Sequence, residues 1–138
     1  MAVLHEKAIH RDIKPSNILI KGGAWLVSDF GLCALVDEDP LSMDGEVVEP
    51  MNWMSQEESA RLSVFASDRT ESSDVFQLAS LFWLVVTRRH PSGIICRDDW
   101  TGPPKLFEPL SRALQHEPMR RLANGSEFAA AIVSAIEP

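Results

Sequence analysis

Two short polar motifs bracket a predicted β-hairpin, and this arrangement constrains the fold more than any other feature of the sequence. The first motif occupies residues 10–17 and reads HRDIKPSN; the second occupies residues 29–31 and reads DFG. Between them lie two apolar runs, residues 18–20 and 25–27, which are separated by Gly22-Gly23. A glycine pair accepts the positive φ angles of a tight turn, so the segment is predicted to form a hairpin.

The hairpin determines which side chains can act together. A hairpin returns its two ends to one place, so Asn17 and Asp29 are predicted to lie side by side. A carboxylate beside an amide oxygen suits Mg²⁺ that carries the phosphates of a nucleotide. Asp12 could then take or orient a proton from an attacking hydroxyl, and Lys14 could neutralise charge on a transferring phosphoryl group.

These motifs resemble the C-terminal lobe of a Ser/Thr protein kinase, whose signatures include H-R-D-L-x-x-x-N and D-F-G. Lys14, two residues after Asp12, is typical of the Ser/Thr class. The small-molecule phosphotransferases, which resemble kinases, are a stronger alternative than a chance match in an unrelated hairpin protein. Arg11, Lys14 and the intact Asp29-Phe30-Gly31 favour the protein kinase. The resemblance implies ATP and Mg²⁺ as cofactors and a protein as substrate.

The resemblance also assigns roles to individual residues. Asp12 would be the catalytic base, Lys14 the phosphate-neutralising group, and Asn17 and Asp29 the metal ligands. Leu19 would form the floor of the adenine pocket. Structural or regulatory roles are implied for further residues. His10 would pack under Phe30 of the Asp29-Phe30-Gly31 motif, and Arg11 would face the activation segment. Asp74 would bond backbone N–H groups near His10 or Arg11, and Arg121 would pair with Glu57.

The predicted fold is mainly α-helical with one small β-hairpin, and residues 1–138 form one partial kinase domain. It would contain the end of the helix before the catalytic loop, the loop itself, the activation segment and late helices. Helices are predicted over residues 73–86, about 109–115, and 128–136. The first of these is apolar nearly all round and should be buried, with Leu78, Leu81, Phe82 and Val85 among its most buried residues.

Composition limits the classes of partner and the cellular compartment that can be expected for this chain. The net charge of −7 argues against nucleic acid and anionic membranes as partners. Cys33 and Cys96 have neither metal-ligand spacing nor a disulfide framework, and no signal peptide is visible, so a cytoplasmic location is expected. The longest apolar stretch, residues 75–86, is too short to span a bilayer.

Residues 32–56 match the activation segment. The run 37–49 is acidic and contains no Lys or Arg, which predicts a solvated loop. Ser42 and Ser55 are the only hydroxyl residues of the segment, so phosphorylation is not expected to be the main control. Pro50 and the pair Ser55-Gln56 depart from the family pattern, which puts substrate docking in doubt more than metal binding.

The sequence contains no glycine-rich loop, strand lysine or helix glutamate of the kind that clamps ATP in the N-terminal lobe of kinases. The N-lobe is therefore expected to be absent from this chain, and a missing segment or a partner would supply it. The isolated chain is expected not to transfer phosphate. A truncated kinase-like binding module and an inactive fragment without catalysis remain open as alternatives.

Overall fold

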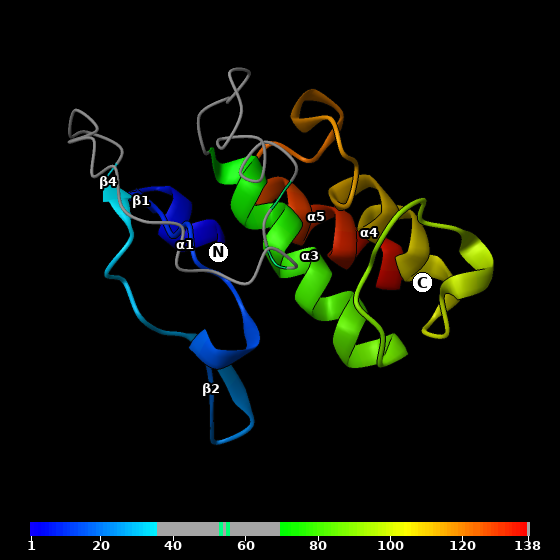
Figure 1. Cartoon of the computed structure of the whole chain (residues 1–138), viewed down its shortest axis with the longest axis horizontal. Coiled ribbons are helices and arrows are strands. Elements are labelled where there is room, and N and C mark those ends of the chain that lie inside the picture. The colour runs from blue at the N-terminus through cyan, green and yellow to red at the C-terminus, as the bar shows by residue number, and fades with distance from the viewer. Residues whose placement is uncertain (36–52, 54, 56–69, 138) are drawn as a thin grey trace.

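Helices form one side of the molecule and a β-hairpin projects from the other. The computed structural model describes residues 1–35, 53, 55 and 70–137. In this part of the chain, the longer helices are α3 (Glu71–Thr87), α4 (Phe107–Ala113) and α5 (Gly125–Ile136), which pack together while the hairpin extends away from them (Figure 1). The described residues are about half helical and contain only small antiparallel sheets, which is compatible with the sequence prediction.

The central helix α3 begins and ends at residues with clear local reasons. Thr70 is its N-cap, and the Ser73 hydroxyl accepts the Thr70 N–H at 3.1 Å. Glu71 and Asp74 place negative charge in the first turn, where the helix dipole favours it. The helix ends at Arg88, which adopts the left-handed conformation with φ of 62°. The observed bounds extend the predicted helix, residues 73–86, by two residues at the start and one at the end.

The apolar core cluster lies between the helices and, within the described part of the chain, consists of residues after position 74, while Ala8 and Ile13 are buried outside it. Trp83 and Trp100 pack with ring centroids 5.2 Å apart near its centre. The buried members are Val75, Phe76, Ala79, Trp83, Trp100, Leu106, Leu110, Ala113, Leu114, Leu122 and Phe128. On α3 they recur at the four-residue spacing of a single helix face.

That spacing corrects part of the burial prediction for α3. Leu81 is buried as predicted, but Leu78 and Phe82 are only half-buried and Val85 is 38% exposed. The helix turns the stripe that contains Val75, Ala79 and Trp83 toward the core. Val85 lies off that stripe, and an apolar sequence alone does not reveal which of several apolar stripes faces inward.

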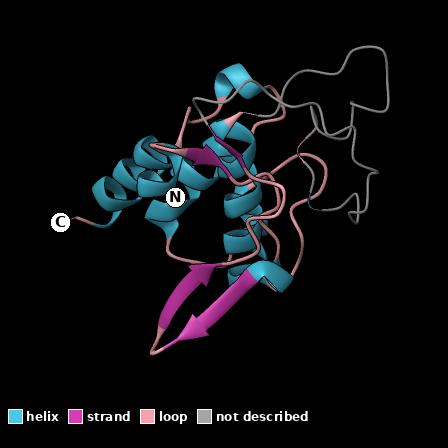
Figure 2. Cartoon of the chain, turned by 90° about the vertical axis from the view of Figure 1, so that its left-hand side faces the viewer, coloured by secondary structure: helices cyan, strands magenta, loops and turns pink. Residues whose placement is uncertain are grey.

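The predicted hairpin is confirmed. Strands β2 (Ile18–Lys21) and β3 (Ala24–Val27) pair antiparallel, with Ile20 opposite Trp25 (Figure 2). Gly22 and Gly23 form the turn with φ of 58° and 79°, angles that L residues rarely adopt. A second two-stranded sheet, β1 (Ala8–Ile9) with β4 (Ala34–Leu35), was not predicted.

The N-terminal helix α1 (Ala2–His5) packs against α5. The contact is close at Gly125, where an added Cβ would lie 2.7 Å from the carbonyl carbon of Met1. Asn124 caps α5, because its Oδ1 accepts the N–H groups of Ser126 and Glu127, both at 3.0 Å. This cap starts the helix three residues before the predicted Phe128.

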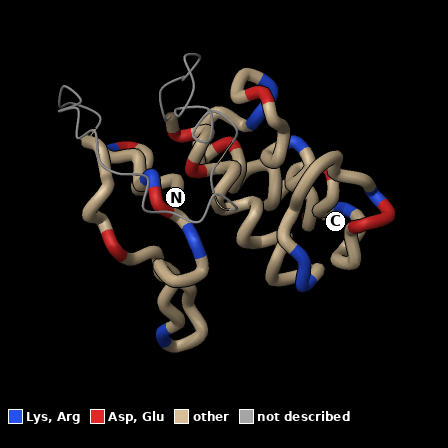
Figure 3. Tube along the Cα trace, in the orientation of Figure 1, with Lys and Arg blue, Asp and Glu red and all other residues tan. Residues whose placement is uncertain are grey.

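In the part of the chain that the structure describes, single-turn 3₁₀ helices connect the longer elements. They are η1 (Pro15–Asn17), η4 (Arg97–Asp99), η5 (Pro104–Leu106) and η6 (Pro118–Arg120). Lys and Arg are interspersed with Asp and Glu along the described trace (Figure 3). None of the helices among the described residues has the length and apolar character that crossing a membrane requires.

Candidate active site

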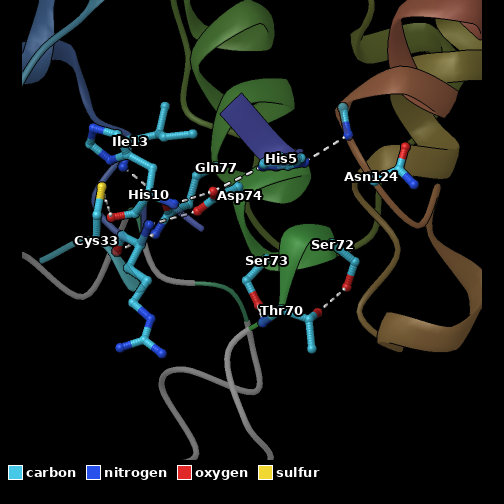
Figure 4. A network of polar contacts seen from close by, with 12 residues as sticks. His5, His10, Ile13, Cys33, Thr70, Ser72, Ser73, Asp74, Gln77 and Asn124 are labelled. Atoms are coloured by element: carbon cyan, nitrogen blue, oxygen red, sulfur yellow. Dashed lines mark hydrogen bonds and ion pairs between the residues drawn. The ribbon is translucent and has the colours of Figure 1, made fainter. Parts of the chain in front are cut away.

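The backbone of the HRDIKPSN loop is held by a carboxylate from α3. Asp74 is fully buried, and its Oδ2 accepts the His10 N–H at 2.6 Å while its Oδ1 accepts the Arg11 N–H at 2.8 Å (Figure 4). The bond that the sequence predicted for Asp74 is therefore present. Arg11 has a φ of 71°, and the paired N–H groups stabilise this unfavourable backbone angle.

His5 adds a third donor to Asp74 and was missed by the sequence analysis. Its Nε2 lies 3.1 Å from Asp74 Oδ2, and its Nδ1 accepts the Gly125 N–H at 2.9 Å. Because Nδ1 is an acceptor, the hydrogen-bond pattern assigns the ring proton to Nε2. His5 thus connects the start of α5 to the carboxylate that holds the loop. No local signal marks it, since its partners are distant in sequence.

Gln77 is the second residue that the sequence analysis missed. Its Oε1 accepts the Ile13 N–H at 2.8 Å, and its Nε2 donates to the Arg11 carbonyl oxygen at 3.4 Å. Gln77 lies three residues after Asp74, on the same side of α3. A glutamine in the apolar stretch that follows Asp74 was the available signal, because a buried amide needs polar partners.

The proposed base and its neighbours are in direct contact. Asp12 is buried, and its Oδ1 lies 2.9 Å from the Lys14 ammonium nitrogen. The Asn17 amide donates to Asp12 Oδ2 at 2.8 Å and to the Asp12 carbonyl oxygen at 2.9 Å. One carboxylate therefore has an ammonium on one oxygen and an amide donor on the other, which fixes its orientation.

His10 joins the loop to the end of the hairpin. Its Nδ1 accepts the Asp12 N–H at 3.3 Å, and its Nε2 lies 3.1 Å from the Ser28 carbonyl oxygen. The predicted contact with Phe30 is present as an edge-to-face pair with centroids 5.1 Å apart. The Cys33 thiol donates to the His10 carbonyl oxygen at 3.6 Å, and burial raises the pKa of this thiol, which keeps it a donor.

The hairpin ends bring Asn17 beside the DFG motif. The Asn17 carbonyl oxygen accepts the Ser28 N–H at 2.8 Å and the Ser28 hydroxyl at 3.0 Å, and Asp29 follows directly. Asp29 is exposed, has a φ of 63°, and accepts the Gly31 N–H on Oδ1 at 3.3 Å.

This donor set can be compared with the needs of a magnesium ion. The Asn17 amide nitrogen is engaged by Asp12, which leaves the carboxamide oxygen as the group for a cation. Among the described residues there is no cluster of three or more His, Cys, Asp or Glu side chains that could hold a metal. One carboxylate and one amide oxygen fit Mg²⁺ that is held jointly with nucleotide phosphates, not a metal held by protein alone.

A pocket of about 430 Å³ adjoins Lys14 and is lined by Pro15, Ser16 and Trp53 among the described residues. Trp53 packs edge-to-face on His90 with centroids 4.8 Å apart. Burial lowers the pKa of His90, against a smaller opposing effect of a backbone hydrogen bond at Pro91.

The side chain expected under adenine, Leu19, is 55% exposed on the hairpin.

The predicted Glu57–Arg121 pair cannot be assessed, because Glu57 lies outside the described residues, as does the acidic run 37–49. Arg121 is buried. Its guanidinium donates to the carbonyl oxygens of Gln115 at 2.5 Å and His116 at 2.8 Å, and lies 4.9 Å from the Phe76 ring centroid.

Known proteins share this sequence pattern. Residues 1–97 match the family model described as protein tyrosine and serine/threonine kinase. The serine/threonine-protein kinase drp72 of Corynebacterium efficiens is 29% identical over 96% of this chain, and the serine/threonine-protein kinase PknA of Corynebacterium glutamicum is 28% identical over 96%. PknA of Mycobacterium tuberculosis is 31% identical over 60% of the chain. The chain spans less than a third of each of these relatives, which are 28%, 30% and 18% covered.

Proposed function

Since the chain belongs to the protein tyrosine and serine/threonine kinase family, we propose that it supplies the catalytic side chains for ATP-dependent phosphoryl transfer to Ser or Thr of a protein substrate. Its place in that reaction would be the C-terminal lobe of the kinase domain. The curated relatives carry the Ser/Thr kinase name, which favours this class over tyrosine kinases.

The observation that carries the proposal is the contact of Asp12 with both Lys14 and Asn17. Asp12 would accept the proton of the substrate hydroxyl, and the Lys14 ammonium, 2.9 Å from Asp12 Oδ1, would offset negative charge as the phosphoryl group transfers. Asn17 would keep the carboxylate oriented through its two bonds to Asp12. Phosphoryl transfer depends mainly on such positioning and on electrostatic stabilisation.

Asn17 and Asp29 are the residues proposed to hold Mg²⁺, and Leu19 is the residue proposed to support adenine. A bound Mg²⁺ would supply positive charge to the nucleotide phosphates. The bonds between Asn17 and Ser28 support this assignment, because they join the backbone of Asn17 to that of Ser28, the residue before Asp29. The exposure of Leu19 leaves its side chain accessible to a planar ring.

Transfer at a useful rate would also need a nucleotide-binding lobe, which a preceding segment or a partner chain would supply. The described residues offer groups for a base and for metal ligands, whereas a kinase also clamps the α- and β-phosphates with a glycine-rich loop and a lysine. The 138-residue chain alone is therefore expected to show no more turnover than its Asp29→Ala variant.

The test compares the chain alone with the chain joined to the N-lobe of a Ser/Thr protein kinase, using ATP, Mg²⁺ and a generic Ser/Thr substrate. The joined protein should phosphorylate the substrate, and Asp12→Asn should lower its kcat by about 100-fold or more, since general bases contribute that much. Wild-type turnover by the Asp12→Asn protein would contradict the proposed base. Turnover by the chain alone, well above Asp29→Ala, would show that no second lobe is needed.

A further inference from the structure

Both peptide groups that flank Asp12 are hydrogen-bonded to one side chain, that of Gln77. The peptide group between Arg11 and Asp12 is bound through its carbonyl oxygen, 3.4 Å from Gln77 Nε2. The peptide group between Asp12 and Ile13 is bound through its N–H, which donates to Gln77 Oε1 at 2.8 Å. Gln77 is 1% exposed, so bulk water does not compete for these groups.

This pattern restricts the geometry of Asp12 itself. The two peptide planes meet at the Asp12 Cα, and their relative orientation is set by the φ and ψ angles of that residue. A carboxamide is planar, with its donor and acceptor at a fixed separation. When it binds both planes, it restricts both angles, and these set the direction in which the Asp12 carboxylate leaves the backbone.

Asp74 cannot provide the same restriction. Its two oxygens bind the N–H groups of His10 and Arg11, which precede the Arg11 Cα and its positive φ angle. Gln77 binds the next two peptide groups along the chain. Asp74 therefore holds the two peptide groups that precede Arg11 Cα, whereas Gln77 holds the two peptide groups on either side of Asp12.

We propose that Gln77 is a positioning residue, which holds the Asp12 carboxylate where Lys14 and Asn17 meet it by binding the peptide groups on both sides of Asp12. The inference deepens the proposed function and rests on it for the reaction, whereas the restriction of the backbone does not depend on catalysis.

The first test uses NMR on the 138-residue chain with two variants and a matched control. Gln77→Met keeps side-chain length and removes both hydrogen bonds, whereas Gln77→Glu keeps the acceptor for Ile13 and loses the donor for Arg11. Ser80→Ala is the control. Ser80 is also buried on α3, and within the described part of the chain its hydroxyl has no hydrogen-bond partner.

Gln77→Met should raise the exchange rate of the Ile13 amide by about tenfold, the loss expected for one buried hydrogen bond. It should also shift the side-chain amide resonances of Asn17, which donates to Asp12. Gln77→Glu should leave Ile13 exchange slow but still shift the Asn17 resonances. If Gln77→Met does not fold, the Gln77→Glu spectrum decides. Asn17 resonances that stay at their wild-type positions in the folded variants would overturn the proposal.

The second test uses the protein joined to an N-lobe. Gln77→Met should lower kcat by about tenfold while KM for ATP changes by no more than about twofold, because misplacement of the base affects the chemical step. Ser80→Ala should change neither. Shifted Asn17 resonances with unchanged kcat would overturn the positioning role. An inactive wild-type joined protein would count against the proposed function alone, since the NMR test decides the restriction of Asp12 without activity.

Discussion

At the scale of single residues, backbone strain is concentrated at the candidate site. Among the described residues, the non-glycine positions with positive φ are Arg11 at 71°, Asp29 at 63° and Arg88 at 62°. Such angles cost an L residue about 1–2 kcal/mol. Arg11 and Asp29 each belong to one of the two polar motifs, and Asp74 offsets the strain at Arg11 with a buried charge that accepts its N–H.

Replacing Asp74 should therefore be costly. In Asp74→Asn, one oxygen acceptor becomes an N–H donor that faces a backbone or ring N–H, so buried donors lose their partner. We expect the free energy of unfolding to fall by about 2–4 kcal/mol, because hydrogen bonds to a charged group are worth about 1.5–3 kcal/mol each. Urea unfolding would measure it, with the exposed Asp98→Asn as the control. A loss for Asp74→Asn no larger than that of the control would contradict the prediction.

His90 should make stability sensitive to acid. Burial lowers the pKa of His90 in the folded chain below its ordinary value of about 6.5. The unfolded chain then binds more protons between the two pKa values, so the free energy of unfolding falls as pH drops through 6.5. His90→Asn should lose less stability than wild type between about pH 7 and 5, whereas the exposed His116→Asn should follow wild type. Identical pH profiles for His90→Asn and wild type would refute this.

At the scale of elements, the sequence predicted the helices and turns whose signals lie within a few neighbouring residues. The run 71–87 and the Gly22-Gly23 hairpin were predictable because caps, turn glycines and apolar runs are short-range signals. The pairing of Ala8–Ile9 with Ala34–Leu35 was not, because two-residue strands carry no pattern and their partners are 25 or more positions apart. Which stripe of α3 faces inward also depends on α4 and α5 rather than on α3 itself.

The same distinction applies to the site. Asp12, Lys14 and Asn17 lie within six residues of one motif, so the sequence alone groups them as candidates for one site. The bonds of His5 to Asp74 and of Gln77 to the loop depend on how the helices pack, because they join residues 64 to 69 positions apart in sequence. Sequence reasoning found the groups proposed for the chemistry and also Asp74, which holds the loop, but it missed His5 and Gln77.

The end of α3 offers a test of element-level strain. Arg88→Gly should raise the free energy of unfolding by about 0.5–1 kcal/mol, because glycine adopts the left-handed C-terminal position without the Cβ clash that Arg88 carries. Thermal or urea unfolding would measure the gain. The matched control is Arg89→Gly, at an exposed neighbour without a positive φ, which should be neutral or destabilising. Equal effects of the two changes would show that Arg88 is not strained.

At the scale of the whole molecule, the apolar core and the candidate site occupy different parts of the chain. Among the described residues, the core cluster between the helices runs from Val75 to Phe128, with Ala8 and Ile13 buried outside it. The loop is hydrogen-bonded to α3 through Asp74 and Gln77. The hairpin is consequently rich in exposed apolar side chains, with Ile20 at 68% and Trp25 at 53%.

Exposed apolar surface of this kind promotes self-association. The double change Ile20→Thr and Trp25→Thr should lower the light scattering of the chain at high concentration. It should change the free energy of unfolding by less than about 1 kcal/mol, since threonine keeps strand propensity. Val3→Thr, at a 75% exposed residue of α1, is the control and should leave association unchanged. Scattering that persists in the double variant would place the association elsewhere.

The positive φ angle of Arg11 also limits how far the motif can be transplanted. The angle is maintained by a carboxylate 63 positions away in the sequence, and the following peptide groups by an amide from the same helix. A peptide that contains only residues 10–31, or the same residues grafted onto an unrelated hairpin, would relax to a different backbone and disperse Asp12, Lys14 and Asn17. The smallest segment that could keep this geometry in another protein is therefore the motif together with α3. A designed protein that reuses the site must include the helix as well.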